Sequence, residues 1–324
     1  MAIMTYREAI SGALREVLQS DPRVFMMGED IGDYGGSYAV TKGFLKEFGP
    51  KRIRDMPIAE SVIVGTGIGA AMGGLRPIVE IMTINFSLLA MDQIVNIAAK
   101  IRYMSGGQVS VPLVIRTVTG GGNQLAATHS QSLEGWFASV PGLEVAVPAT
   151  PQDARGLLRT ALQDNNTTIF VEHSLLYPLK GEVLDGWYIL PFGKADVKRP
   201  GKDVTIVSYL RMTQVALRAA ERLAKEFQIE AEVVDLRTLR PLDTETAVES
   251  VKKTNRCVVV EEAWQTGGFG AEVASRVQEK AFDHLDGPVA RVGGKDVPMP
   301  YSRKLELAAI PSEDDVIRAV KTLV

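Results

Sequence analysis

The sequence predicts an α/β protein built from two three-layer αβα domains, each a mainly parallel sheet with helices on both faces. Short apolar runs alternate with amphipathic helix patterns along most of the chain. The alternation is interrupted once, in a segment rich in glycine, proline and lysine between residues 181 and 202. A length of 324 residues accommodates two domains of ordinary size. We therefore expect domains at residues 1–185 and 203–324, joined by a linker at residues 186–202.

The strands and helices of the first domain are predicted from the spacing of its apolar residues. Apolar runs of four or five residues predict buried strands, and apolar positions three to four residues apart predict helices. The predicted strands are Val24–Gly28, Ile78–Ile81, Leu113–Thr117, Glu144–Val147 and Thr168–Glu172, and the predicted helices are Thr5–Gln19, Glu60–Gly74, Leu89–Tyr103 and Thr150–Asp164.

The second domain repeats the pattern over residues 203–324, where at most an edge strand is expected in the preceding linker. The strands here are again short and apolar, which is typical of a parallel sheet buried on both faces. The predicted order is strand Val204–Tyr209, helix Met212–Phe227, strand Glu230–Asp235, helix Asp243–Lys253, strand Arg256–Glu261, helix Gly270–Phe282, strand Val289–Val292 and helix Glu313–Leu323.

The charge balance excludes two classes of partner. The 36 basic residues nearly match the 39 acidic ones, so neither a nucleic acid nor an anionic membrane is expected as the main partner. The longest uncharged stretches, Ser61–Leu75 and Ile81–Met91, fall short of the ~20 apolar residues that cross a bilayer. The single cysteine, Cys257, lies in an apolar run and is expected as a buried side chain. With no visible targeting segment, we expect a soluble intracellular protein.

A run of glycines at Gly65, Gly69 and Gly73 has two interpretations. The stretch Gly65–Ala70 satisfies the relaxed dinucleotide pattern G-x-G-x-x-A, which requires a strand just before the first glycine. The four-residue spacing instead places the three glycines on one face of a helix, where a second helix can approach closely. We favour helix packing, because glycine weakens a helix unless close packing offsets the loss. We expect this face at a subunit interface.

Two polar positions are candidates for chemistry. Glu60 stands between an apolar segment and a long uncharged run. It is therefore either a carboxylate that interacts with the helix dipole or a desolvated acid–base group. The local sequence by itself favours the helix-dipole role. His129 follows three consecutive glycines, in a loop of the kind that carries ligand sites in α/β folds. A general acid–base role, an anion-binding role and an ordinary exposed histidine all remain open for it. His173 and His284 are expected to be structural.

Several familiar catalytic signatures are absent. The chain contains no H-E-x-x-H, no G-x-S-x-G, no P-loop lysine motif and no cluster of histidine and cysteine ligands. Simple hydrolase, NTPase and zinc-enzyme interpretations therefore have no support from motifs.

A set of moderately specific stretches, in order and over nearly the whole chain, resembles the β subunit of the E1 components of 2-oxo acid dehydrogenases. In the first domain these stretches are Tyr6–Ala9, Met27–Asp30, Asp55–Glu60, Asn85–Ser87, Arg102–Gly107, His129–Ser132 and Pro141–Leu143. In the second they are Asp235–Asp243 and Glu261–Gly270. The resemblance implies a pyrimidine-binding α/β domain followed by a transketolase-type C-terminal domain.

The same resemblance implies roles for individual residues. Glu60 would hydrogen-bond N1′ of the aminopyrimidine ring of thiamine diphosphate, which reverses the preference for a dipole role. Phe86 would stack on that ring, and Glu29 would join the cofactor-binding residues. His129 would lie near the substrate and the incoming lipoyl group, as a proton donor or a charge-stabilising group. The resemblance further implies a structural potassium ion in some relatives, at positions that match Leu113, Ala161, Asp164 and Asn166.

The resemblance also implies a missing half. Relatives hold the diphosphate and its Mg²⁺ through a G-D-G motif on a partner α subunit, and this chain contains no G-D-G. We therefore expect an α₂β₂ heterotetramer that decarboxylates pyruvate and acetylates a lipoyl group on the E2 acyltransferase. Branched-chain 2-oxo acids or acetoin as substrates, a non-catalytic scaffold and a nucleotide-dependent oxidoreductase are the alternatives. The expected location is the cytoplasm of a bacterium, or the mitochondrial matrix or plastid stroma for a trimmed organelle protein.

Overall fold

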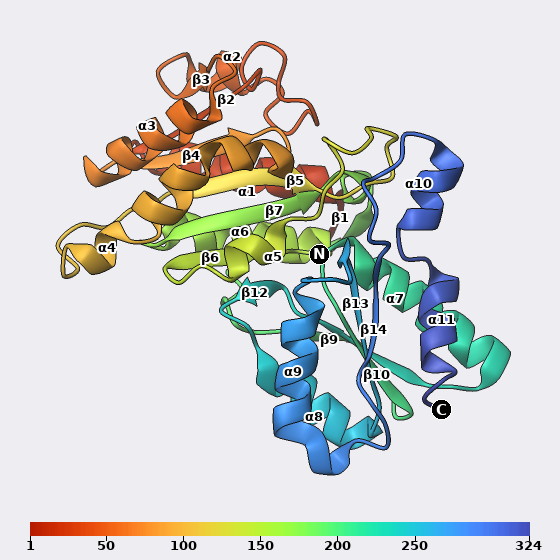
Figure 1. Ribbon diagram of the computed structural model, residues 1–324. Coiled ribbons are helices and arrows are strands. Elements are labelled where there is room, and N and C mark those ends of the chain that lie inside the picture. Colours follow the sequence, from red (N-terminus) through yellow and green to blue (C-terminus); the bar gives the residue numbers. More distant parts are fainter. The chain divides into compact units, whose positions relative to one another are not determined.

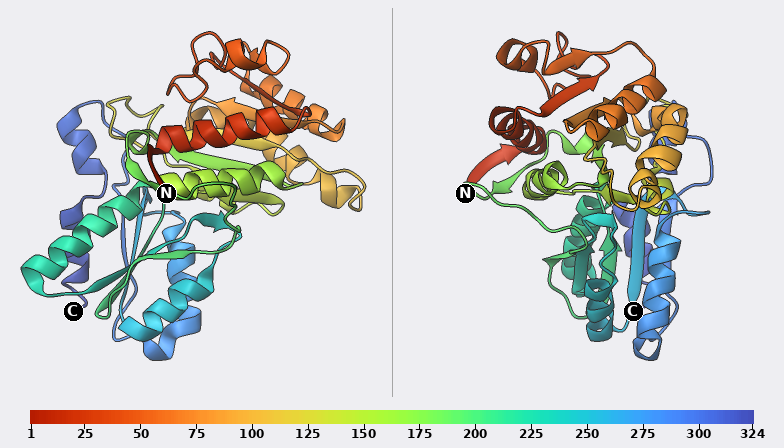
Figure 2. Two further views of the ribbon diagram at one scale, coloured as in Figure 1. Left: turned by 180° about the vertical axis from the view of Figure 1, so that it is seen from behind. Right: turned by 90° about the vertical axis from the view of Figure 1, so that its left-hand side faces the viewer.

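The computed structural model describes residues 1–324, which form two compact units (Figures 1 and 2). Unit 1 comprises Met1–Thr119 and Trp136–Phe192, and unit 2 comprises Gly120–Gly135 and Gly193–Val324. Each unit contains a parallel sheet covered by helices, so the predicted α/β class is confirmed. The loop at residues 120–135 belongs to unit 2 by its contacts, although it follows a strand of unit 1. No helix is both long and apolar enough to span a membrane.

Unit 1 is organised around parallel strands in the order β6-β7-β5-β4-β2-β3. Their bounds are β2 (Val24–Gly28), β3 (Ile53–Asp55), β4 (Arg76–Ile81), β5 (Val114–Thr119), β6 (Leu143–Ala146) and β7 (Thr167–His173). Most of their residues are buried, and β2, β5 and β7 are buried throughout. Continuous burial is what a parallel sheet with helices on both faces requires.

Two long helices of unit 1, α1 and α6, begin where short polar side chains cap them. Helix α1 (Tyr6–Ser20) starts with a capping box between Thr5 and Glu8, and α6 (Pro151–Gln163) starts at Thr150, whose side chain accepts a hydrogen bond from the backbone of Asp153. These two helices run side by side (Figure 2, left) and bury their apolar faces in one core cluster. Helix α3 (Glu60–Met72) packs against β4.

The predicted helix over residues 89–103 is wrong in detail. A 3-10 helix η1 (Ile84–Ala90), a π-helix η2 (Asp92–Ala98) and a short helix α4 (Ile101–Met104) take its place. Apolar spacing does not distinguish α-helical turns from 3-10 or π-helical ones, so the sequence pattern could not reveal this change.

Unit 2 contains a sheet in the order β14-β13-β10-β11-β9. The bounds are β9 (Asp196–Arg199), β10 (Val204–Ser208), β11 (Ala231–Asp235), β13 (Cys257–Trp264) and β14 (Ala290–Gly294). Helices α7 (Arg211–Arg222), continued by the π-helix η4 (Leu223–Phe227), α8 (Thr244–Thr254), α9 (Gly270–Ala281), α10 (Arg303–Ala309) and α11 (Glu313–Val320) complete the unit. All eight predicted elements of this domain are present, shifted by a few residues at their ends.

The segment expected as a linker carries regular structure. Strand β9 pairs antiparallel with β11 at the edge of the second sheet. Within unit 1, β8 (Lys180–Val183) pairs antiparallel with β1 (Ala2–Thr5). The remaining short elements, which the sequence did not predict, are α2 (Phe44–Phe48), α5 (Glu134–Ala138), η3 (Ser174–Leu176), β12 (Thr238–Arg240) and η5 (Phe282–His284).

Candidate active site

Three predicted cofactor residues follow three adjacent strands of unit 1. Glu29 comes directly after β2, Glu60 follows β3 by five residues, and Phe86 follows β4 by five. Strand β2 pairs with both β3 and β4 in parallel, so the carboxyl ends of the three strands meet at one edge. That edge is where open α/β sheets bind ligands.

Glu60 is the first residue of α3 and is only 3% exposed. No side chain caps helix α3 at Ala59. The free backbone N–H groups of its first turn therefore lie near the negative charge of Glu60. No hydrogen bond or ion pair within the chain engages the Glu60 carboxylate. The Glu60 carboxylate is therefore available to a group from outside the chain.

Glu29 lies close enough to Glu60 for the two carboxylates to repel each other. Burial raises the pKa of the Glu29 carboxyl, and the charge of Glu60 raises it further. Its Oε1 atom is buried and makes no hydrogen bond. The loop that follows is held from the sheet side, because Asp55 accepts a hydrogen bond from the backbone of Gly32 at 2.6 Å. Two buried carboxylates at one strand edge form a site suited to holding a proton on a bound ring nitrogen.

Phe86 supplies the apolar part of this edge. It is half-buried in η1, and its backbone N–H donates to the carbonyl oxygen of Thr83 at 3.0 Å. Helix η1, which carries Phe86, packs against α3, which begins at Glu60. An aromatic ring and two carboxylates on elements at one sheet edge fit a heteroaromatic ligand that presents a flat face and a protonatable nitrogen. The residues present therefore fit the aminopyrimidine half of thiamine diphosphate.

His129 lies in the loop of unit 2 and is exposed. Its Nδ1 atom lies 3.0 Å from the hydroxyl oxygen of Thr128, and its backbone N–H donates to the carbonyl oxygen of Ala126. The next residue, Ser130, is buried, and its hydroxyl has no partner. Gln131 lines a pocket of about 490 Å³ together with Trp264, Thr266, Asp296, Val297 and Pro298. The exposed imidazole is accessible to an incoming substrate.

The predicted potassium donors gather at the opposite, amino-terminal edge of the first sheet. Leu113 precedes β5, Asn166 precedes β7, and Ala161 and Asp164 lie at the end of α6. Carbonyl and carboxylate oxygens of this kind suit a hard cation. Some acceptors are already used: Asp164 Oδ1 accepts from the backbone of Asn166 at 2.6 Å, and the Leu113 carbonyl accepts from the backbone of Thr168 at 3.0 Å.

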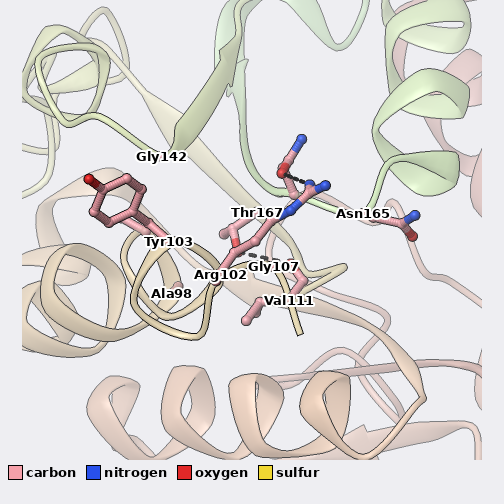
Figure 3. A pocket seen from close by; sticks show the side chains of 11 residues that line it. Ala98, Arg102, Tyr103, Gly107, Val111, Gly142, Asn165 and Thr167 are labelled. Atoms are coloured by element: carbon pink, nitrogen blue, oxygen red, sulfur yellow. Dashed lines mark hydrogen bonds between the residues drawn. The ribbon is translucent and has the colours of Figure 1, made fainter. Parts of the chain in front are cut away.

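Two arginines also donate hydrogen bonds to oxygens at this edge. Arg76 donates to the carbonyl oxygen of Leu162 at 3.0 Å and to that of Asp164 at 2.5 Å. Arg102 donates to the side-chain oxygen of Asn166. Figure 3 shows Arg102, Tyr103 and Asn165 around a pocket of about 440 Å³. The carbonyls at the end of α6 thus have a cationic partner within the chain.

A buried charge network between three strands of unit 1 was not predicted from the sequence. Arg116 on β5 is 2% exposed and binds Glu172 on β7 through two bonds of 2.7 and 2.9 Å. Its third bond, 2.6 Å long, reaches Glu80 on β4. The hydroxyl of Tyr177 donates to Glu172 at 2.7 Å, and burial raises the pKa of Tyr177 well above its usual value. A lone arginine inside an apolar strand pattern is the only signal in the sequence for this network.

The predictions for Cys257 and His173 agree with the structure. Cys257 is fully buried, and burial raises the pKa of its thiol to about 12. His173 is buried, and its Nδ1 accepts a hydrogen bond from the backbone of Leu175, which is a structural role. Gly65 to Ala70 lie within helix α3 rather than in a turn after a strand, so the dinucleotide-binding interpretation is wrong.

Two family models match this chain, one for each unit. The model described as "Transketolase, pyrimidine binding domain" matches residues 2–180, and that described as "Transketolase, C-terminal domain" matches residues 193–316. A solved structure titled "Split gene transketolase, inactive beta4 tetramer" aligns with a TM-score of 0.78 at 28% identity, over 99% of this chain and 98% of that one. The fold and the site edge thus define a transketolase-like protein, a class that implies thiamine diphosphate as cofactor.

Similar proteins of known name identify the family within this class. A rice (Oryza sativa subsp. japonica) protein named pyruvate dehydrogenase E1 component subunit beta-2, mitochondrial, is 50% identical over 98% of this chain and 85% of its own length. Subunits beta of the same component from Rickettsia felis and Rhizobium meliloti are 49% and 48% identical, over 98% and 100% of this chain and over 97% and 70% of their own lengths. The chain belongs to the family of β subunits of the pyruvate dehydrogenase E1 component.

Proposed function

We propose that this chain, together with an α subunit, carries out the oxidative decarboxylation of pyruvate and the reductive acetylation of lipoyl groups on E2, the activity EC 1.2.4.1. The observation that carries the proposal is the buried, unpartnered Glu60 beside Glu29, at the carboxyl edge of the first sheet. A scaffold subunit would have no use for two adjacent buried carboxylates, because they destabilise the fold unless a ligand satisfies them.

The chain's own residues would hold one half of the cofactor. Thiamine diphosphate supplies, when bound, a carbon nucleophile for the 2-oxo group and a sink for the electrons released with CO₂. Glu60 would hold a proton at N1′ of the aminopyrimidine ring, and burial keeps water from competing for that proton. Phe86 would stack on the ring face, a contact worth about 1 kcal/mol beyond burial. Glu29 would keep the site electrostatically favourable for a protonated ring.

His129 would serve the second half of the reaction. An exposed imidazole can donate a proton or stabilise charge as the acetyl group passes to the dithiolane of the lipoyl group. The pocket of about 490 Å³ that Gln131 lines, two residues along the same loop, would provide room for an acceptor group.

The α subunit would hold the diphosphate and Mg²⁺, because no G-D-G motif occurs in the sequence. The proposed assembly is an α₂β₂ heterotetramer. Helix α3 supplies a surface for it: no atom lies within 4 Å of a Cβ built at Gly69, and Val62 and Met72 on the same helix are 54% and 47% exposed. We also propose that potassium binds at Leu113, Ala161, Asp164 and Asn166.

The test is turnover of the purified chain with and without a coexpressed α subunit, with thiamine diphosphate and Mg²⁺, in potassium and in sodium buffers. We expect decarboxylation of pyruvate only with α, faster than that of a branched-chain 2-oxo acid. Glu60→Gln should lower it by about 10²–10⁴-fold while the complex still assembles, because a general acid–base contribution has that size. An assembled wild-type complex that turns over neither acid would refute the proposal, and one that prefers the branched-chain acid would refute the choice of substrate.

A further inference from the structure

The segment from residue 120 to residue 131 is a closed loop. The backbone N–H of Gly120 donates to the carbonyl oxygen of Gln131 at 3.2 Å, which brings the two ends together. A compact loop of this length with adjacent ends is an Ω-loop, a form that frequently carries function. Because His129 lies near its end, the conformation of the whole loop decides where the imidazole is presented.

Two carboxylates of unit 2 hold the first part of this loop. Glu306 on α10 is fully buried and accepts hydrogen bonds from the backbone N–H groups of Gly122 at 2.9 Å and Gln124 at 3.0 Å. Glu262 on β13 is 8% exposed and accepts from the backbone N–H of Gly121 at 2.7 Å. Charge-assisted bonds to backbone N–H groups are stronger than neutral ones, more so when they are buried.

Packing and strain show that the loop is held in one particular shape. A Cβ at Gly121 would come within 3.0 Å of Ile310 and 3.1 Å of Met299, so the backbone lies directly against unit 2. Gln124 and Ala126 adopt left-handed φ values of 58° and 63°, which non-glycine residues rarely do. Such conformations persist only where the surroundings fix them, and here the two carboxylates and the packing at Gly121 do so.

The same contacts exclude another role for the glycines. Consecutive backbone N–H groups in a glycine-rich loop commonly bind phosphate or another anion. In this loop the amides of Gly121, Gly122 and Gln124 already bind the chain's own carboxylates. A second anion would have to displace a buried glutamate, so the loop is built for presentation rather than for anion binding.

We propose that Glu306 and Glu262 are positioning residues that hold the loop of residues 120–131 in the conformation in which His129 meets the acyl acceptor. This inference rests on the proposed function of His129 in acetyl transfer. Both glutamates would act through the backbone of the loop, which they bind at Gly121, Gly122 and Gln124. Loss of the Glu306 contacts should therefore impair acetyl transfer to the lipoyl group more than decarboxylation.

The experiment is a double-mutant cycle in the assembled α–β complex. Glu306→Gln, His129→Ala and the double variant are assayed for acetylation of a free lipoyl domain and for decarboxylation coupled to ferricyanide, which bypasses the lipoyl group. We expect Glu306→Gln to lower kcat for acetylation by about tenfold or more, since misplacing a catalytic group costs that much. In the His129→Ala background the same change should have no further effect.

A matched control separates positioning from general loosening of the unit. Glu232 is also buried in unit 2, but its carboxylate accepts from the backbone of Gly201 and pairs with Lys253. Glu232→Gln should change both activities less than twofold. The proposal is overturned if Glu232→Gln lowers acetylation as much as Glu306→Gln does. It is equally overturned if the Glu306→Gln effect persists in full without His129.

A second variant covers the case in which Glu306→Gln does not fold. Gly122→Ala leaves Glu306 intact but strains the loop, because Gly122 has a φ of +104°. It should show the same selective loss of acetylation and the same dependence on His129, and a loss independent of His129 would overturn the proposal. A wild-type complex without turnover on any 2-oxo acid refutes the proposed function itself. An active wild type with an unaffected Gly122→Ala variant refutes only this inference.

Discussion

Glu29 shows at the scale of one residue how a binding site differs from a core. Its carboxyl group is buried without a partner on one oxygen and lies near the charge of Glu60. In an ordinary core such a group would be replaced by an apolar side chain. Retaining it costs stability in the absence of ligand, which is the usual relation between a prepared site and its fold.

The raised pKa of Glu29 predicts a pH-dependent stability in the cofactor-free complex. The folded protein holds the proton more tightly than the unfolded chain, so Glu29 lowers stability progressively as pH rises above its ordinary range. Glu29→Gln removes this loss and should raise Tm by about 2 °C at pH 8, with a smaller gain at pH 5. Differential scanning calorimetry at both pH values checks this. The exposed Glu221→Gln should give no gain, and equal gains for Glu29→Gln at both pH values would contradict the assignment.

At the scale of elements, the network of Arg116, Glu80 and Glu172 joins three neighbouring strands of unit 1. The parallel register places Glu80 opposite Arg116, and Glu172 lies on the strand at the other side of β5. Three bonds from one guanidinium to two carboxylates leave none of its charge uncompensated. The network thereby ties the strands β4, β5 and β7 together near their carboxyl ends.

Arg116→Leu should therefore destabilise the protein by about 3–5 kcal/mol, because it leaves the buried carboxylate of Glu172 unpaired. Urea unfolding measures this change. The matched variant Arg218→Leu breaks an ion pair with Glu313 in which the arginine is 52% exposed, and it should cost less than about 1 kcal/mol. Adding Glu172→Gln to Arg116→Leu should recover part of the loss. Equal costs for the two arginine variants would show that burial does not matter here.

At the scale of the whole molecule, helix α3 has one face that packs within the chain and another face that is open to a second subunit. Gly67 faces the sheet, where an added Cβ would meet Val79 at 2.8 Å. Gly69, two residues on, has nothing within 4 Å, and Gly65 has only the side chain of Gln93 at 3.7 Å. The open glycines lie on a helix of 13 residues that carries no charge after Glu60, a composition suited to contact with another subunit.

This contrast predicts opposite effects for two similar substitutions. Gly67→Leu should destabilise the chain itself by about 1–3 kcal/mol through overpacking. Gly69→Leu should leave unfolding of the chain unchanged or slightly improved, because leucine favours a helix by about 1 kcal/mol over glycine, yet it should weaken assembly. Urea unfolding and sedimentation with the α subunit distinguish the two. If the Gly69→Leu variant assembles normally with the α subunit, this face of α3 does not lie at the interface.

Sequence patterns predicted most of the elements that carry the site because those patterns are local. Glu29 and Phe86 follow the predicted strands Val24–Gly28 and Ile78–Ile81, whereas the strand β3 before Glu60 was not predicted. The roles of all three residues were indicated by the resemblance to a family. The helix predicted over residues 89–103 is instead divided among η1, η2 and α4, because apolar spacing does not distinguish α-helical turns from 3-10 or π-helical ones. The edge strand that the sequence allowed in the predicted linker is present as β9, paired antiparallel with β11.

The sequence by itself determined the fold class, the order of the elements and the family of E1 β subunits, since each depends on spacing and residue type along the chain. Only the tertiary structure decided which charges meet. Glu306 lies more than 180 residues after the loop that it binds, and Arg116 lies 36 and 56 residues from its two partners. Contacts at such separations depend on strand order and helix packing, and no local pattern encodes them.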